Sequence, residues 1–358
     1  MKRLWSVVFG VLFLSVAVAP SATAADAKKP AVIRIGTAFT AGNSRPFSLQ
    51  TIGVLHQQGL LEEEFKKDGI KIEWVFFKGV SPAVNEAFAN DTIDIGATSE
   101  LGAIIAKAGG LKIKLIASGG TRGNSYLAVP IDSQATKVED LKGAKLATSN
   151  ATNFQLAFER ILQLKGLTHK DFKAYNLGPA DGVAALASKD INGAVYGTQL
   201  FAPRRLGLVK IIYSTRDDFP DKWKSFSGIF VTEKFAKDHP DLTERFLKVF
   251  ARAAKWASDE NNREAYFLGQ AKTGTSVNDI REDAEGTPLS VKNTPLLDDF
   301  VVGHFRDTIQ FALERGLIRK AYDVNSLVDA SFLEAALKDE GLDHFWAKYD
   351  GEGKETTK

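Results

Sequence analysis

Two patterns of apolar residues alternate along the chain, and each pattern predicts one kind of secondary structure. Short apolar or alternating runs indicate buried strands, whereas an apolar residue at every third or fourth position indicates an amphipathic helix. The runs that indicate strands cover residues 31–36, 70–77, 92–97, 113–117, 126–130, 145–148, 172–177, 193–197, 209–213 and 229–232. The stretches between them that indicate helices include residues 60–67, 82–89, 153–165, 181–188 and 199–206. This alternation favours parallel α/β sheets.

Helical spacing dominates the last third of the chain. Helices are expected there at residues 242–258, 263–271, 295–314 and 326–338. Residues 118–125 contain three glycines but lack the spacing of a phosphate-binding loop, so we interpret them as a crossing between two lobes without regular structure. Two α/β lobes followed by helices imply a ligand cleft between the lobes, where the carboxyl ends of parallel strands meet.

Residues 145–164 join a buried strand, a polar turn and an amphipathic helix. Thr152 and Gln155 are three residues apart at the helix start, which fits a capping box. The first amides of such a helix point out of its start and can bind an anion. From these residues alone two interpretations stay open: the turn caps its own helix, or it binds a negatively charged ligand.

The first 24 residues have the pattern of a secretory signal peptide. Lys2 and Arg3 precede an apolar run over residues 4–19, and a small-residue cleavage site ends at Ala24. The apolar run is short for a bilayer span. No cysteine follows the site, so lipid attachment there is excluded. We therefore expect cleavage after Ala24 and a free periplasmic protein.

Charge and sulfur content narrow the partners further. The leader carries two positive charges and no negative ones, so its removal takes the formal net charge from +2 to zero. A neutral chain without basic clusters has no footprint for nucleic acid. The chain has no cysteine, and its single methionine is Met1, so the mature chain contains no sulfur. Two explanations of this missing sulfur stay open: neutral drift, or synthesis of the protein in quantity when sulfur is scarce.

No pattern of catalytic or metal-binding residues stands out in the chain. The five histidines do not pair at metal-ligand spacing, and we expect them in surface helices or loops: His56, His169, His239, His304 and His344. The motifs of zinc proteases, serine hydrolases and P-loop enzymes are absent from the sequence. We therefore expect no catalysis, no cofactor and no metal.

Several stretches, in this order, resemble the periplasmic substrate-binding proteins of ATP-binding-cassette (ABC) importers, in the taurine, aliphatic-sulfonate and nitrate group. The stretches that carry the resemblance are GLLEEEF, IDIGATSELG, GNSYLAV, VEDLKGAKLATSNATNFQLAFERIL and EKFAKDHPDLTERFLKVF. The resemblance implies an α/β two-lobe periplasmic binding protein-like fold of type II. Residues 25–125 and 228–345 would form lobe I, residues 126–227 lobe II, and residues 346–358 a polar tail. The polar composition of residues 351–358 predicts disorder there. The resemblance also implies a monomer that binds a small anionic ligand and delivers it to the membrane permease of an ABC importer.

The resemblance also implies a set of ligand-binding residues. They are Thr37, Arg45, Thr98, Ser99, Glu100, Asn124, Tyr126, Asn150, Thr152, Asn153, Phe154 and Gln199. Glu100 would meet a ligand ammonium or serve the protein's own hydrogen bonds. Tyr126 stands where similar taurine binders carry an acid, which disfavours taurine. Gln199 lies near the position of a family tryptophan, which leaves room for a larger ligand tail or supplies a polar contact.

Other residues have structural interpretations that weigh against a ligand role. Arg122 is expected to be structural, and Arg204 and Arg205 to lie on a solvated helix face. Phe39 and Phe47 are expected in the core.

An organosulfonate, either an alkanesulfonate or an arylsulfonate, is the favoured ligand, because the mature chain lacks sulfur and the Gly-Asn-Ser crossing motif is present. The alternatives in the same class are nitrate, bicarbonate, an aromatic carboxylate or a pyrimidine precursor. An enzyme on the same fold and the sensing lobe of a transcription regulator are alternatives from other classes.

Overall fold

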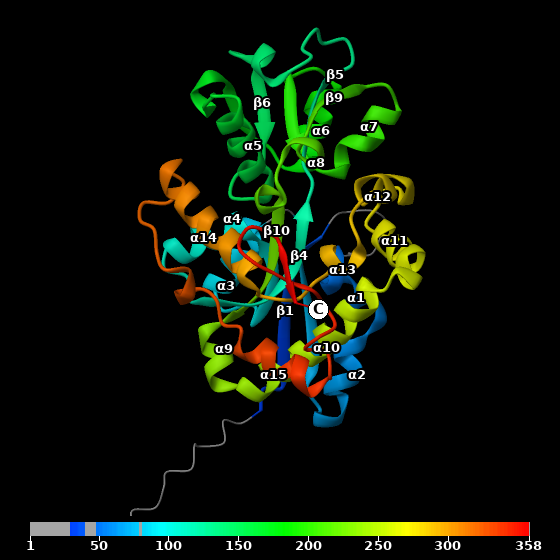
Figure 1. Cartoon of the computed structure of the whole chain (residues 1–358), viewed down its shortest axis with the longest axis vertical. Coiled ribbons are helices and arrows are strands. Elements are labelled where there is room, and N and C mark those ends of the chain that lie inside the picture. The colour runs from blue at the N-terminus through cyan, green and yellow to red at the C-terminus, as the bar shows by residue number, and fades with distance from the viewer. Residues whose placement is uncertain (1–28, 40–47, 79–80, 358) are drawn as a thin grey trace, which may run out of the picture.

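The chain forms two lobes, each built on a five-stranded sheet with helices on both faces (Figure 1). The computed structural model describes residues 29–39, 48–78 and 81–357. The expected signal peptide, Arg45 and Phe47 lie outside the described residues, and so does the side chain of Phe39. The expected two-lobe α/β fold is confirmed, but each sheet is mixed rather than parallel throughout.

The sheet of lobe I has the strand order β2-β1-β3-β10-β4. Its strands are β1 (Val32–Phe39), β2 (Lys71–Lys78), β3 (Ile95–Ser99), β4 (Ile113–Gly123) and β10 (Ser225–Thr232). β1 runs parallel to β2 and β3, whereas β10 runs antiparallel to β3 and β4. The expected return strand at 229–232 is thus the end of a longer strand inserted between β3 and β4.

The sheet of lobe II has the strand order β7-β6-β8-β5-β9. Its strands are β5 (Tyr126–Pro130), β6 (Lys145–Thr148), β7 (Lys173–Asn176), β8 (Gly193–Tyr196) and β9 (Val209–Ser214). β6 is parallel to β7 and β8, and β5 is antiparallel to β8 and β9. The carboxyl end of β6 therefore delivers the turn at 149–152 to one edge of this sheet.

Two chain segments connect the lobes: the passage from β4 to β5 and the passage from β9 to β10. We call these two segments the crossing. The glycine-rich stretch was expected to lack regular structure, but β4 continues through it to Gly123. A Cβ on Gly119 would lie 2.9 Å from the Ser227 hydroxyl, and one on Gly120 would lie 2.5 Å from the Gln50 amide. The glycines thus let neighbouring side chains lie directly on a strand that a larger residue would push away.

Helices of lobe I cover both faces of its sheet and account for the helical last third of the chain. They are α1 (Gln50–Gln58), α2 (Leu60–Phe65), α3 (Ser81–Ala89), α4 (Glu100–Ala108), α9 (Glu233–Asp238), α10 (Pro240–Ser258), α11 (Arg263–Ala271), α12 (Val277–Asp283), α13 (Leu289–Lys292), α14 (Asp299–Glu314) and α15 (Ser331–Asp339). One core, which includes Phe246 and Phe250, packs α1, α10 and α15 on the sheet. A second core, which includes Phe300 and Phe305, packs α3, α4 and α14 on its other face.

Lobe II has fewer and shorter helices. They are α5 (Asn153–Leu164), α6 (Pro179–Ala187), α7 (Phe201–Arg205) and α8 (Thr215–Asp218). α5 buries Phe158, Ile161 and Leu162 against one face of the sheet. α6 buries Leu186 on the other face, beside Tyr196. One residue of α5, Leu156, instead belongs to the second core of lobe I, so α5 contacts both lobes.

The C-terminal tail was expected to be disordered, and this expectation is wrong. Strands β11 (Lys348–Tyr349) and β12 (Glu355–Thr357) pair antiparallel and form a small separate sheet. Among the described residues, no helix has the length and the apolar run needed to cross a bilayer.

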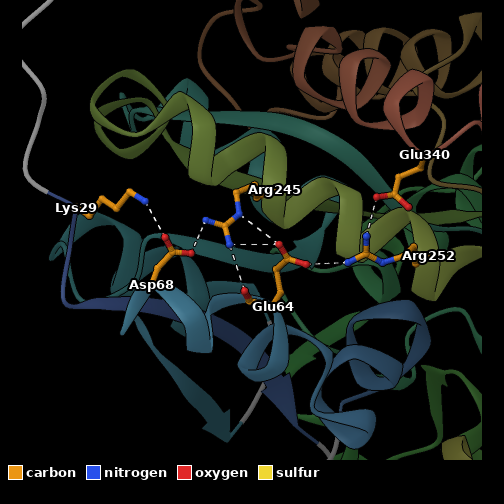
Figure 2. Close-up of polar contacts among 6 residues, drawn as sticks. All are labelled: Lys29, Glu64, Asp68, Arg245, Arg252 and Glu340. Atoms are coloured by element: carbon orange, nitrogen blue, oxygen red, sulfur yellow. Dashed lines mark hydrogen bonds and ion pairs between the residues drawn. The ribbon is translucent and has the colours of Figure 1, made fainter.

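A network of ion pairs fastens several lobe I elements to α10 (Figure 2). Arg245 pairs with Asp68 at 2.7 Å and with Glu64 at 3.2 Å. Arg252 pairs with Glu64 at 3.0 Å and with Glu340 at 2.6 Å. These partly exposed pairs lie within one lobe and do not depend on how the lobes are placed.

Candidate ligand-binding site

The turn between β6 and α5 caps its own helix through side chains. The Thr152 Oγ1 atom accepts a hydrogen bond from the Phe154 amide at 3.2 Å and donates one to the Ser149 carbonyl at 2.6 Å. Gln155 Oε1 accepts from the Ala151 amide at 2.7 Å. In a capping box, Gln155 would accept from the amide of the N-cap residue, Thr152. It accepts instead from the amide of the preceding residue, Ala151. For the Thr152 hydroxyl, the self-capping interpretation describes the contacts observed.

The same turn keeps groups that an anion could use. The first amides of a helix have no acceptor within the helix, and among those of α5 a described side chain caps only that of Phe154. Asn153 is half-buried, and its amide side chain has no hydrogen-bond partner among the described residues. Ala151 has a φ of 54°, a left-handed conformation that is unfavourable for alanine, and such residues cluster at functional sites. Asn150 is exposed, and its backbone amide donates to Asn176 Oδ1 at 2.9 Å.

Thr152 and Asn153 should respond differently to replacement by alanine. Thr152→Ala removes a fully buried helix cap and should lower the free energy of unfolding by about 1 kcal/mol. Asn153→Ala should leave unfolding nearly unchanged and should weaken ligand binding several-fold. Urea unfolding and titration calorimetry measure the two effects. An Asn153→Ala protein that binds as tightly as the parent would remove Asn153 from the site.

On the lobe I side, the start of α4 presents small hydroxyl groups. Ser99 is the N-cap of α4, and its hydroxyl lies 2.7 Å from that of Ser81 at the start of α3. The Thr98 hydroxyl is buried and has no hydrogen-bond partner among the described residues. Thr37, on the neighbouring strand β1, is buried and hydrogen-bonds the Ser48 hydroxyl at 2.7 Å. The hydroxyls of Ser99 and Thr37 therefore already have protein partners, whereas that of Thr98 does not.

The starts of α4 and α5 meet across the two lobes at a glycine. A Cβ on Gly102 would lie 2.8 Å from the Ala151 carbonyl oxygen of lobe II and 2.4 Å from the Ser81 Cβ of lobe I. No side chain fits at such distances without a shift of the neighbours. Gly102 therefore allows the hydroxyl-bearing start of α4 to approach the turn that precedes α5.

Glu100 is fully buried and serves the protein's own interactions. Its Oε1 atom accepts the Phe226 amide at 2.9 Å and lies 3.8 Å from His304 Nε2. His304, which we expected at the surface, is buried and stacks on the Phe226 ring at 3.8 Å. Arg160 reaches into the same region from α5 and lies over the Phe311 ring at 4.7 Å. Burial lowers the pKa of Arg160 to about 10, and the charge of Glu100 opposes this change.

Asn124, in the crossing, and Tyr126, at the start of β5, both bind Asp283 on α12. Tyr126 Oη donates to Asp283 Oδ1 at 2.8 Å, and Asn124 Nδ2 lies 3.2 Å from the same oxygen. Burial, and then the charge of Asp283, raise the pKa of Tyr126 well above its usual range. Asp283 carries no sequence signal of its own, because it becomes part of this region only when α12 meets lobe II.

Phe154, Gln199 and Asn124 converge on Gly197. A Cβ on Gly197 would lie 3.2 Å from Gln199 Oε1, 3.6 Å from the Phe154 ring and 3.8 Å from the Asn124 carbonyl oxygen. Gln199 accepts the Gly197 amide at 3.1 Å, and Phe154 packs edge-on against Tyr196 with centroids 5.6 Å apart. Gly197 is thus surrounded by an apolar ring, one amide side chain and the backbone carbonyl of Asn124.

The described arginines near the crossing are bound to protein groups. Arg122 is buried, pairs with Asp221 at 2.8 Å and lies over the Phe300 ring at 4.5 Å, as its expected structural role requires. Arg204 and Arg205 were expected on a solvated helix face, but both form ion pairs with carboxylates of α12. Within the described residues, no group of three or more His, Asp and Glu side chains is arranged to hold a metal ion.

Two lobes joined by a double crossing, with two helix starts facing one another between them, define the class of periplasmic binding protein folds. The chain belongs to the NMT1/THI5-like family, whose profile matches residues 64–264. The predicted family resemblance is therefore confirmed.

Individual proteins extend this likeness over nearly the whole chain. An aliphatic sulfonates-binding protein of Bacillus subtilis (strain 168) is 27% identical over 347 residues, which cover 95% of this chain and 98% of that protein. A periplasmic sulfonate-binding protein from Methylobacillus flagellatus KT has a crystal structure that matches with a TM-score of 0.77 at 32% identity, over 89% of this chain and 97% of that one. A nitrate-binding protein from Synechocystis PCC 6803 matches with a TM-score of 0.67 over 91% of this chain and 95% of that one, at 12% identity, which shows the shared fold alone.

Proposed function

We propose that this chain is an extracytoplasmic binding protein that captures a small organosulfonate between its lobes and delivers it to the membrane permease of an ABC importer. The observation that carries the proposal is the likeness, over 89% of the chain, to a sulfonate-binding protein at 32% identity. Binding is the function, and the chain performs no catalysis. The protein acts as a monomer in the periplasm after removal of residues 1–24, and it does not bind nucleic acid.

The chemistry of the two facing helix starts supports a sulfonate ligand. A sulfonate stays ionised at any physiological pH, and amides, hydroxyls and helix N-termini can stabilise it without a cation. We assign its head group to the start of α5, where Asn153 has a free side-chain amide, and to the Thr98 hydroxyl across the cleft. We assign its tail to the region of Phe154, Gln199 and Gly197 in lobe II. Arg45, outside the described residues, stays a candidate for the head group.

Glu100 leaves the proposed set of ligand contacts because its carboxylate is fully buried and binds the Phe226 amide. The Thr152 side chain leaves it as well, because its hydroxyl caps α5. Thr152 and its neighbours would then act on the ligand through backbone amides.

Titration calorimetry with a panel of anions tests the proposal. We expect saturable one-to-one binding of alkane- or arylsulfonates with a dissociation constant in the micromolar range or below, the range of about −8 kcal/mol or stronger. Sulfate, nitrate and bicarbonate should bind at least tenfold more weakly, because they lack a tail for the lobe II region. Tight binding of nitrate or of a carboxylate, with no response to any sulfonate, would overturn the proposal.

A further inference from the structure

We propose that α12 is a clasp that holds the two lobes together beside the crossing and sets how often the ligand-free protein opens. α12 belongs to lobe I and lies beside α7 of lobe II, to one side of the crossing (Figure 1). It carries three carboxylates within its seven residues: Asp279, Glu282 and Asp283. Each of the three binds a residue of lobe II or of the crossing.

Two of the clasp carboxylates pair with neighbouring arginines of α7. Arg204 makes a bidentate contact with Glu282, with N–O distances of 2.8 and 2.6 Å. Arg205 forms an ion pair with Asp279, whose side chain is 3% exposed. Bidentate arginine–carboxylate pairs are among the strongest hydrogen-bonded contacts and fix the relative orientation of the two groups. These two pairs therefore hold α7 and α12 in one arrangement.

A further arginine of lobe II extends the clasp to the α12 backbone. Arg216, on α8, donates from Nη1 to the Glu282 carbonyl oxygen at 3.0 Å. This carbonyl lies in the last turn of α12, where the helix dipole is negative and a cation is favoured. The pKa of Glu282 is lowered by the hydrogen bond from Arg204 and by the nearby charges of Arg216 and Arg205, so its carboxylate stays ionised at neutral pH.

Asp283 connects the clasp to the crossing and to β5. It accepts hydrogen bonds from the Asn124 side chain and from the Tyr126 hydroxyl, and it lies 3.3 Å from Lys292 Nζ of lobe I. Tyr126 is buried beside Phe201, at the start of α7, with ring centroids 4.8 Å apart. The clasp thus extends from the partly exposed Arg204–Glu282 pair to Tyr126, which belongs to the same hydrophobic cluster as Phe154.

Rotation of the lobes apart about the crossing must break the pairs between α7 and α12, because the partners belong to different lobes. The pairs therefore favour the closed arrangement even without ligand. They raise the fraction of ligand-free molecules whose lobes are already closed. Arg204 and Glu282 are about one-third exposed, at 32% and 39% of their side-chain surface, so salt weakens this pair. Opening should therefore increase with ionic strength.

The mature chain is free of cysteine, so the lobes can be labelled at chosen positions. Leu206 of lobe II is 73% exposed and Leu268 of lobe I is 56% exposed. In a chain that carries both L206C and L268C, spin labels on the two cysteines report the distance between the lobes by pulsed electron paramagnetic resonance. In the ligand-free protein we expect mainly a short distance at low salt and a growing long-distance population at 1 M salt.

The clasp variant is Arg204→Gln with Arg205→Gln in the labelled chain. We expect the ratio of closed to open molecules to fall about tenfold, since two charge-assisted interlobe pairs are lost. The matched control is Arg245→Gln with Arg252→Gln, which also replaces two arginines but breaks only ion pairs that lie within lobe I (Figure 2). The control should keep the distances of the parent. Equal distance distributions in the parent and the clasp variant would overturn the proposal.

A second variant separates loss of the clasp from damage to α7. Glu282→Gln removes one carboxylate on the lobe I side and leaves α7 unchanged. It should also lower the ratio of closed to open molecules, because Arg204 loses its charged partner. Its far-ultraviolet circular dichroism should match that of the parent. If Glu282→Gln folds and stays closed, the proposal also fails.

The consequence for ligand exchange rests on the proposed function. The clasp variant should release a bound alkanesulfonate about tenfold faster than the parent in stopped-flow displacement, while the control variant should not. If the parent binds no sulfonate, the proposed function fails, and the distance measurements still decide whether α12 is a clasp.

Discussion

Replacement of Glu100 by glutamine should lower the free energy of unfolding by about 1–3 kcal/mol, because it removes the negative charge that favours the charged form of the buried Arg160. Glu100 is fully buried, and its charge opposes the lowering of the Arg160 pKa by burial. Glutamine can still accept the Phe226 amide, so the loss reports the charge rather than the hydrogen bond. Urea unfolding, monitored by tryptophan fluorescence, gives the change from the shift of the midpoint.

Two further variants make the Glu100 result specific. Glu63→Gln removes an exposed carboxylate from the first turn of α2 and should change stability by less than about 0.5 kcal/mol. Glu100→Gln combined with Arg160→Met removes both charges and should regain part of the loss, since apolar side chains can replace a buried charged cluster. A Glu100→Gln protein as stable as the Glu63→Gln protein would show that the buried charge is not needed.

Gly102→Ala should weaken ligand binding by about tenfold or more, because the added methyl group occupies the point where the lobes meet. The Cβ would lie 2.8 Å from the Ala151 carbonyl oxygen of lobe II. Overpacking at such a point costs about 1–3 kcal/mol. In the proposed mode of binding, this cost falls on the closed form that holds the ligand, and each 1.4 kcal/mol lowers the affinity about tenfold. Titration calorimetry with the sulfonate that binds most tightly measures the loss.

The added methyl group also approaches Ser81 within lobe I, at 2.4 Å, so a second variant is needed to isolate the contact between lobes. Ser81→Gly removes the nearer clash and should leave the clash with Ala151 in place. The combination of Ser81→Gly and Gly102→Ala should therefore stay impaired relative to Ser81→Gly alone. Equal affinities of these two proteins would assign the effect to lobe I packing and contradict a contact needed for closure.

Elements with a clear local pattern were predictable from the sequence. The strands expected at 126–130 and 145–148 are β5 and β6, and the helix expected at 263–271 is α11. Buried strands and amphipathic helices reveal their positions because the spacing of apolar residues matches the geometry of the element itself. The expected position of the polar turn at 149–152, at the carboxyl end of a strand, follows from the same local rule.

Features that depend on distant partners were not predictable. β4 continues through its glycines because β10, which follows much later in the chain, supplies a neighbouring strand that pairs as far as Gly123. α12 is short and rich in acids, and its role follows from arginines that lie on another lobe. The burial of Glu100 and His304 likewise arises where α4 and α14 meet β10. Sequence spacing carries no record of such contacts, so arginines and a histidine were wrongly expected to face solvent.

The C-terminal strands have a practical consequence for fusions to this protein. The Tyr349 ring lies 4.9 Å from the Arg122 guanidinium, and Glu352 pairs with Lys222 at 2.6 Å, so the tail is fastened beside the crossing. Thr357, the last described residue, pairs with Lys348 in this small sheet, so a fluorescent protein joined after the tail would be carried by lobe I, and its bulk could hinder the proposed movement of the lobes. β1 begins at the end of lobe I away from lobe II (Figure 1). An affinity tag ahead of Lys29 is thus the choice that leaves opening and closing undisturbed.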